Sequence, residues 1–186
     1  MSVSGNKHTL KDLMIKNAEL VSAIVKNVKN INDAVRYCID ITLKQREKNI
    51  AAPGLDQVYT NILDTECKKE NIQLITENVR AISGKSFAGL SVGDIGIAET
   101  GTVIIYSESE DIRIASMLCN THFIILPEIK IVRCFEDISE DLKRKFASQS
   151  DYTAFITGPS RTADIERVLT IGVHGPLELH LLIINS

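Results

Sequence analysis

The sequence contains no tryptophan, and aromatic residues make up only 5% of it. It therefore offers no row of aromatic side chains on which nucleic-acid bases could stack. The formal net charge is −3, which gives no general attraction to nucleic acid or to an anionic membrane. No apolar run has the length that a membrane-spanning helix needs. These absences argue against a nucleic-acid partner and against a membrane span.

Clustered cysteines are lacking as well. The four cysteines, Cys38, Cys67, Cys119 and Cys134, lie far apart, and no Cys-x-x-Cys pair occurs. We therefore expect neither a disulfide framework nor an iron–sulfur cluster in this chain. No set of residues has the spacing of known metal sites, so we expect no metal either. The first residues lack the apolar core of a signal peptide, and we expect a cytoplasmic protein.

The composition that remains is typical of a single globular domain with a sizeable core. The chain has 186 residues, of which 44% are hydrophobic and 24% charged. Residues 10–28 and 34–48 carry apolar side chains at helical spacing, and residues 30–33 can cap the second helix. We therefore divide the chain into an N-terminal helical segment, residues 1–48, and an α/β domain, residues 49–186. The two helices could pack on the domain as a hairpin or present a docking surface to a partner.

Within the second part, short apolar strands alternate with helices. Strands are expected over 72–75, 87–90, 102–106, 122–127, 152–157 and 179–184. Helices are expected over 55–67, 112–119, 135–147 and 163–169, with a glycine-rich turn region over 92–98. Strands that are apolar throughout are typical of a parallel sheet buried on both faces. The sequence thus predicts an α/β fold, with an open, largely parallel sheet, helices on both faces and ligands beyond the carboxyl ends of the strands.

The first polar cluster comprises Glu99, Thr100, Gly101 and Thr102, between an apolar turn and a buried strand. A carboxylate placed there would be partly desolvated, which raises its pKa and makes it a candidate acid, base or nucleophile. The alternative, which the spacing alone favours, is that Glu99 pairs with an arginine and that the next two residues make a turn.

The second cluster runs from the end of one expected strand into an expected helix. Its candidate ligand-binding residues are Gly158, Pro159, Ser160, Arg161, Thr162 and Asp164. Free N–H groups at a helix N-terminus attract anions, and an arginine fork suits carboxylate or phosphate. The alternative is plain capping of the helix by Ser160 or Thr162. Composition does not separate an anion site from a capped helix.

The third cluster places His174 between two glycines, one of which is Gly175. A histidine with that much room could reach a ligand and carry a proton. The alternative is a turn after a helix that ends at glycine, with His174 bonded to the backbone, and a lone histidine is more often of this structural kind.

Taken together, the three clusters resemble the pattern of the LUD-domain family, the lactate-utilisation proteins. The stretches that carry the resemblance are 97–102, 158–166 and 172–176. It covers roughly residues 87–186, and residues 1–48 carry no family motif. The family's fold is similar to that of ribose-5-phosphate isomerase, glucosamine-6-phosphate deaminase and the CoA transferases. This agrees with the α/β fold expected from the strands.

The resemblance implies a role in oxidising L-lactate to pyruvate, beside iron–sulfur partners with LUD and cysteine-rich domains. This chain has no ferredoxin-like cysteine motif, so we expect an accessory subunit without a cluster. The resemblance also implies one shared ligand site at the carboxyl edge of the sheet. It assigns no catalytic roles, and Glu99 and His174 are catalytic candidates by their own chemistry.

Two alternatives stay open. The chain could be an enzyme or sensor for a small anionic metabolite, such as a carboxylate, a sugar phosphate or an acyl-CoA. It could also be a structural module in which the three clusters only make turns and caps. An oligomer is compatible with each of these hypotheses.

Overall fold

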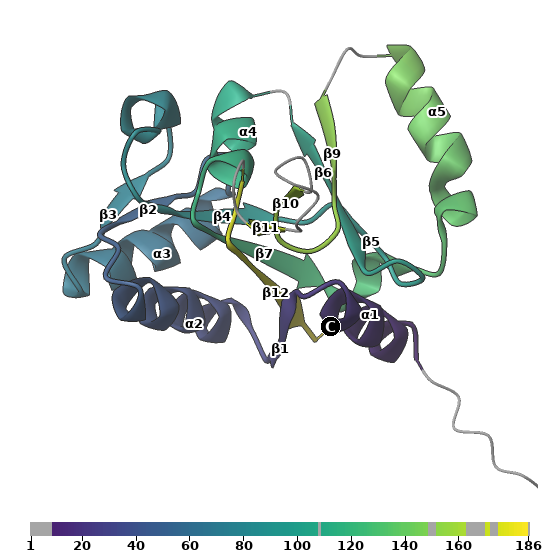
Figure 1. Cartoon of the computed structure of the whole chain (residues 1–186), viewed down its shortest axis with the longest axis horizontal. Helices are drawn as coiled ribbons and strands as arrows, with labels where there is room; N and C mark the ends of the chain where they lie inside the picture. The colour runs from purple at the N-terminus through teal and green to yellow at the C-terminus, as the bar shows by residue number, and fades with distance from the viewer. Residues whose placement is uncertain (1–8, 108, 149–151, 163–169, 172–174, 186) are drawn as a thin grey trace, which may run out of the picture.

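The computed structural model describes residues 9–107, 109–148, 152–162, 170–171 and 175–185. Its centre is a six-stranded sheet in which every neighbouring pair is parallel. In spatial order the strands are β1 (Ile24–Val28), β12 (Glu178–Ile184), β7 (Thr121–Pro127), β4 (Ala88–Val92), β2 (Asn49–Ala51) and β3 (Gln73–Ile75). The predicted open, largely parallel sheet is therefore confirmed (Figure 1).

Helices cover both faces of this sheet, as predicted. On one face lie α2 (Ile31–Lys44) and α3 (Gln57–Lys69), which pack Val35, Cys38 and Leu63 against Phe123 and Leu182 of the strands. On the other face lie α1 (Leu10–Leu20) and α4 (Glu110–Met117), together with a second sheet (Figure 1). The core clusters therefore sit on both sides of the parallel strands, which explains why the central strands are largely apolar.

The second sheet was not expected. Its strands, in spatial order, are β8 (Ile131–Val132), β5 (Ile95–Ile97), β6 (Thr102–Ser107) and β9 (Tyr152–Ile156). β6 is antiparallel to both of its neighbours. The expected turn over 92–98 thus contains a strand, and the Asp94 carboxylate closes the β5–β6 hairpin by accepting the Tyr106 N–H at 2.8 Å. On the outer side, α5 (Ser139–Ser148) packs Leu142 against this sheet.

Shorter elements complete the described chain. These are the 3₁₀ helices η1 (Val79–Ile82), η2 (Glu128–Lys130) and η3 (Phe135–Ile138), and a small antiparallel pair, β10 (Arg161–Thr162) with β11 (Thr170–Ile171). No described helix combines the length and the apolar character that crossing a bilayer requires. The expected helix over 163–169 lies outside the described residues.

The N-terminal segment differs from the prediction of two successive helices. The first helix ends at Leu20, Ser22 adopts a positive φ of 69°, and residues 24–28 form β1 at the edge of the main sheet. The β-branched residues of this stretch suit a strand, and pairing with β12 satisfies their backbone. The division at residue 48 stays a prediction, and strands from both sides of it belong to one sheet. The second helix does begin after Asn30, whose side chain accepts the Asp33 N–H.

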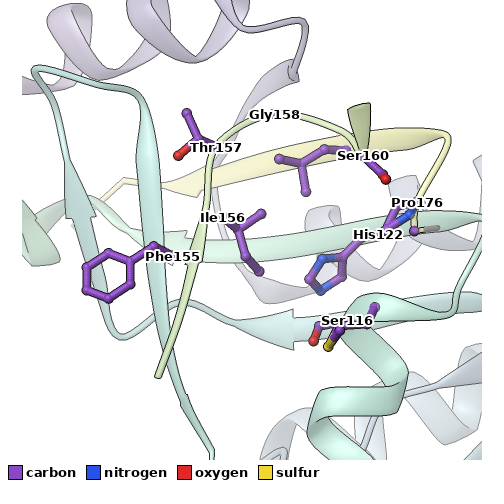
Figure 2. Close-up of a pocket in the computed structure, with 11 residues that line it drawn as sticks. Ser116, His122, Phe155, Ile156, Thr157, Gly158, Ser160 and Pro176 are labelled. Carbon is purple, nitrogen blue, oxygen red and sulfur yellow. The ribbon is translucent and has the colours of Figure 1, made fainter. Parts of the chain in front are cut away.

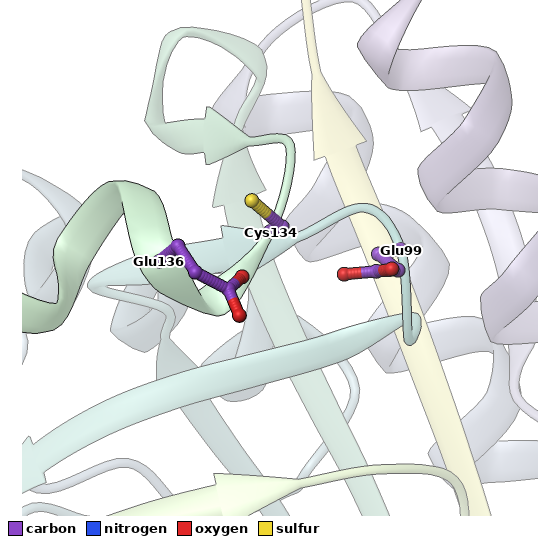
Figure 3. A group of neighbouring side chains, drawn as sticks. All are labelled: Glu99, Cys134 and Glu136. Atoms are coloured by element: carbon purple, nitrogen blue, oxygen red, sulfur yellow. The ribbon is translucent and has the colours of Figure 1, made fainter.

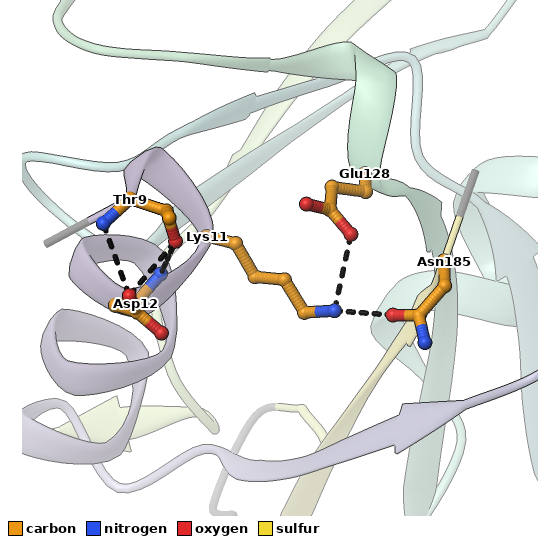
Figure 4. A network of polar contacts seen from close by, with 5 residues as sticks. All are labelled: Thr9, Lys11, Asp12, Glu128 and Asn185. Carbon is orange, nitrogen blue, oxygen red and sulfur yellow. Dashed lines mark hydrogen bonds and ion pairs between the residues drawn. The ribbon is translucent and has the colours of Figure 1, made fainter.

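Polar contacts fasten α1 to the rest of the fold (Figure 4). At its start, Thr9 and Asp12 form a capping box, in which each side chain accepts the other residue's backbone N–H. The Lys11 ammonium lies 3.0 Å from a carboxylate oxygen of Glu128 and also donates to the Asn185 side chain. Since Glu128 and Asn185 follow β7 and β12, the N-terminal end of α1 is held at the carboxyl edge of the sheet. Its C-terminal end lies near the amino edge, close to the start of β1.

Candidate functional site

Two of the predicted clusters meet at the C-terminal end of α1. In the 99–102 turn, Gly101 has a φ of 65°, and its Cα lies so close to the backbone of Ala18 that a Cβ would collide with it. The Asn17 side-chain amide donates to the carbonyls of Ala98 and Glu99, at 2.8 and 2.9 Å. Gly101 is therefore required by a close approach of the backbone to α1 and by a positive φ.

The 158–162 loop contacts the same helix end. Gly158 has a φ of 74°, and a Cβ on it would collide with the Val21 carbonyl oxygen. The Arg161 guanidinium donates to that same oxygen. Val21 is the C-cap residue of α1, so Arg161 places its charge where the helix dipole favours a cation. The structure thus gives Arg161 a role at the C-terminal end of α1, a contact that the sequence did not predict.

A chain of hydroxyl groups joins the two segments. Thr100 Oγ1 lies 2.7 Å from Thr102 Oγ1, which in turn lies 2.8 Å from Thr157 Oγ1. Thr157 precedes Gly158 at the end of β9. The structure therefore brings together two segments that are far apart in the sequence, although it places the Glu99 side chain elsewhere.

Part of the 158–162 loop is extended. Arg161 and Thr162 pair with Ile171 and Thr170. The helix expected from residue 163 lies outside the described residues, so the anion site at its N-terminus stays a prediction. Asp164 and His174 lie outside the described residues.

A cavity of about 220 Å³ opens beside the 158–162 loop (Figure 2). We call it the amino-edge cavity, because His122 and Leu179 each stand second in their strands, β7 and β12. Three of the predicted site residues line it: Gly158, Ser160 and Gly175. The other lining residues are Ser116, Met117, His122, Phe155, Ile156, Thr157, Pro176 and Leu179. The 158–162 loop therefore lies at the amino edge of the main sheet, whereas we expected its site at the carboxyl edge.

His122 is the lining residue that sequence reasoning missed. It lies fully buried on β7, and its ring projects between Ile156 and Ser116 (Figure 2). Its Nε2 is 3.0 Å from the hydroxyl of Ser91 on the neighbouring strand β4, whereas its Nδ1 has no partner among the described residues. Burial lowers the pKa of His122 to about 3, so the imidazole is neutral at cellular pH.

A larger cavity of about 460 Å³ lies at the carboxyl ends of β2, β4 and β7, where parallel sheets usually bind ligands. We call it the carboxyl-edge cavity. Its charged lining residues are Asp56, Asp94 and Lys130. Each one holds backbone: Asp56 accepts the Tyr59 N–H, Asp94 accepts the Tyr106 N–H, and Lys130 donates to the Gly93 carbonyl. None of the predicted site residues lines this cavity.

Glu99 belongs to neither cavity. Its carboxylate lies on the surface with Cys134 and Glu136, and one ligand atom of each residue lies within 4.8 Å of the others (Figure 3). Among the described residues, these three side chains form a group whose spacing could suit a metal ion. A hydrogen bond with Glu136 raises the pKa of the Cys134 thiol, which disfavours the thiolate that a metal would need. The predicted catalytic role of Glu99 therefore receives no support from its surroundings.

Comparison with known proteins places the chain in a family. The family model described as LUD domain matches residues 11–184. The chain belongs to the LUD domain family. The match includes β1 and all of α1 but its first residue, and β1 belongs to the main sheet.

Several curated proteins share this LUD domain under the name lactate utilization protein C. The one from Macrococcus caseolyticus is 28% identical over 167 residues, which cover 84% of this chain and 69% of that protein. The one from Oceanobacillus iheyensis is 30% identical over 162 residues, covering 81% and 66%. The one from Halalkalibacterium halodurans is 28% identical over 192 residues, covering 97% and 82%. The matched part thus spans about two thirds of the first two proteins.

A solved structure shares the fold of this LUD domain. It is the crystal structure of a DUF162 family protein from Deinococcus radiodurans, with a TM-score of 0.65 and 15% sequence identity. The superposition covers 94% of this chain and 96% of the other. At this identity the likeness shows the fold alone.

Proposed function

We propose that this LUD domain protein serves lactate utilisation as a subunit that carries no iron–sulfur cluster. Its partners would be iron–sulfur proteins with LUD and cysteine-rich domains, which oxidise L-lactate to pyruvate. The lactate role is supported by the names of the three relatives described above. The expectation that this chain holds no cluster is supported by the placement of its thiols.

The thiols are poor cluster ligands for a physical reason. Iron–sulfur clusters are held by thiolates that converge on one point. Cys38, Cys67 and Cys119 are buried, and burial raises the pKa of all three thiols, that of Cys67 to about 12. Cys134 lies apart, at the surface group with Glu99. The thiols are therefore protonated at cellular pH, and they are free, which fits the cytoplasmic location that we propose.

The experiment that tests this function is a clean deletion in a source strain that has no other lactate oxidase. We expect the deletion strain to lose growth on L-lactate and to keep growth on glucose, and the intact gene to restore the loss. A tagged chain purified from lactate-grown cells should bring down iron-containing partners, while the chain purified alone should contain no iron. Normal growth of the deletion strain on L-lactate would contradict the proposal.

The alternative is an enzyme or sensor for a small anionic metabolite. In the carboxyl-edge cavity, Lys130 is the cationic residue among the described lining residues that could bind such an anion. Asp56 and Asp94 line the same cavity, and their two negative charges oppose an anion there. Arg161, one of the residues on which that prediction rested, donates a hydrogen bond to the Val21 carbonyl of α1. This alternative is therefore the weaker of the two.

A further inference from the structure

We propose that the amino-edge cavity binds a small uncharged molecule, whose polar group hydrogen bonds to His122 Nδ1 at the cavity wall. The proposal is independent of the lactate role, because it rests on the cavity itself.

The first observation is an unmet hydrogen bond. His122 is fully buried, its Nε2 is taken by Ser91, and its Nδ1 has no partner among the described residues. A buried polar atom without a partner is costly, and most such atoms in folded proteins are paired. His122 is among the residues that line the amino-edge cavity, so we infer that an occupant supplies the missing partner once the side chains covering Nδ1 move aside.

The second observation is the absence of charge from the described wall. None of the lining residues is an aspartate, glutamate, lysine or arginine, and His122 is neutral. An anion entering the cavity would give up part of its hydration, and no described lining residue offers it a cation in return. The Arg161 guanidinium, which is not among the lining residues, binds the Val21 carbonyl at the end of α1. The described wall therefore favours an uncharged ligand.

The third observation is the mixture of surfaces. Met117, Ile156 and Leu179 supply apolar walls, while Ser116 and Ser160 add hydroxyl groups. The Ser116 hydroxyl already donates to the Arg113 carbonyl, which leaves its lone pairs to accept. The volume of about 220 Å³ is below the range typical of drug-sized ligands. A short neutral amide, ester or alcohol, with an apolar part and one or two hydrogen-bonding groups, matches these features.

Pairs of probes that differ only in charge test the proposal directly. L-Lactamide is compared with L-lactate, and methyl pyruvate with pyruvate, each pair at equal concentration and pH 7. The readout is the NMR chemical shift of the His122 ring nitrogens, together with the methyl groups of Met117 and Leu179. We expect the neutral member of at least one pair to shift these signals in a saturable way and its anionic counterpart to leave them unchanged.

Two variants locate the binding. His122→Phe keeps a ring but removes Nδ1, and we expect it to weaken the neutral probe roughly tenfold, the effect of losing one buried hydrogen bond. Ser160→Leu should abolish binding by filling the cavity, and it leaves His122 in place if His122→Phe does not fold. Ser83→Leu, on the exposed surface after η1, is the matched control and should bind the probe as the original chain does.

Two results would overturn the proposal. One is saturable binding of lactate or pyruvate in this cavity at least as tight as that of the neutral counterpart. The other is that no neutral probe shifts the His122, Met117 and Leu179 signals, which would leave the cavity without the ligand class proposed for it.

Discussion

His122 makes the stability of the fold depend on pH, with a sign and a size that follow from its burial. Its pKa is lowered from 6.5 to about 3 in the folded protein, whereas in the unfolded chain it stays near 6.5. Between these values the unfolded chain binds a proton that the folded protein does not. The stability that depends on a neutral His122 is therefore fully present above pH 6.5, and it is lost as the pH falls toward 3. From pH 7 to pH 5 the loss is about 2 kcal/mol, at 1.36 kcal/mol per unit of pKa shift.

The assay is urea unfolding of the original chain and of His122→Phe at pH 7 and pH 5. Burial also lowers the pKa of His180, which contributes with the same sign, but this residue is present in both proteins and cancels in the comparison. We expect the original chain to lose about 2 kcal/mol more free energy of unfolding than the variant over this interval. Equal losses in the two proteins would refute the buried, neutral state of His122.

Three further predictions concern the ends of α1 and the thiols. Gly101→Ala should lower the free energy of unfolding by about 3 kcal/mol, because it combines positive-φ strain with a collision against α1, and chemical denaturation measures it. Arg161→Ala should lower it by about 1 kcal/mol and leave the affinity of a neutral probe unchanged in a parallel NMR titration. Anaerobic reconstitution of the purified chain with iron and sulfide should give no absorbance between 400 and 450 nm, roughly the range of thiolate-bound clusters, since its buried thiols are protonated.

The sequence predicted the elements that depend on residues close together in the chain. The apolar runs that became β7 and β12 and the cap at Asn30 are examples. Residues 24–28 fit a helix by spacing, because Val21, Ile24, Val25 and Val28 also recur at helical intervals. Residues 24–28 form a strand because they pair with β12, which lies near the other end of the chain. Such a non-local partner leaves no trace in a short stretch of sequence.

The second sheet was missed for a related reason. The glycines of residues 92–98 favoured a turn, but a Cβ on Gly96 would collide with Leu126 of the main sheet and one on Gly93 with Val103 of the second sheet. They permit close packing of two sheets, which a single sequence does not distinguish from a turn. The predicted fold class was still right, because the core packs on the parallel strands of the main sheet.

The candidate site was predicted in part. Two of the segments that the sequence singled out meet in space, through the contact between Thr102 and Thr157. It did not reveal that their glycines and Arg161 serve the end of α1. His122 was not among the predicted site residues, although a histidine within an apolar strand is itself a signal. On the same face of the neighbouring strand, Gly89 lets the backbone of α4 approach and Ser91 bonds to His122.

The crystal structure of the protein soaked with L-lactamide tests the central claim about the site most directly. We predict density for the ligand in the amino-edge cavity, with a polar atom within hydrogen-bond distance of His122 Nδ1. Density for the ligand only in the carboxyl-edge cavity, beside Asp94 and Lys130, would contradict the account.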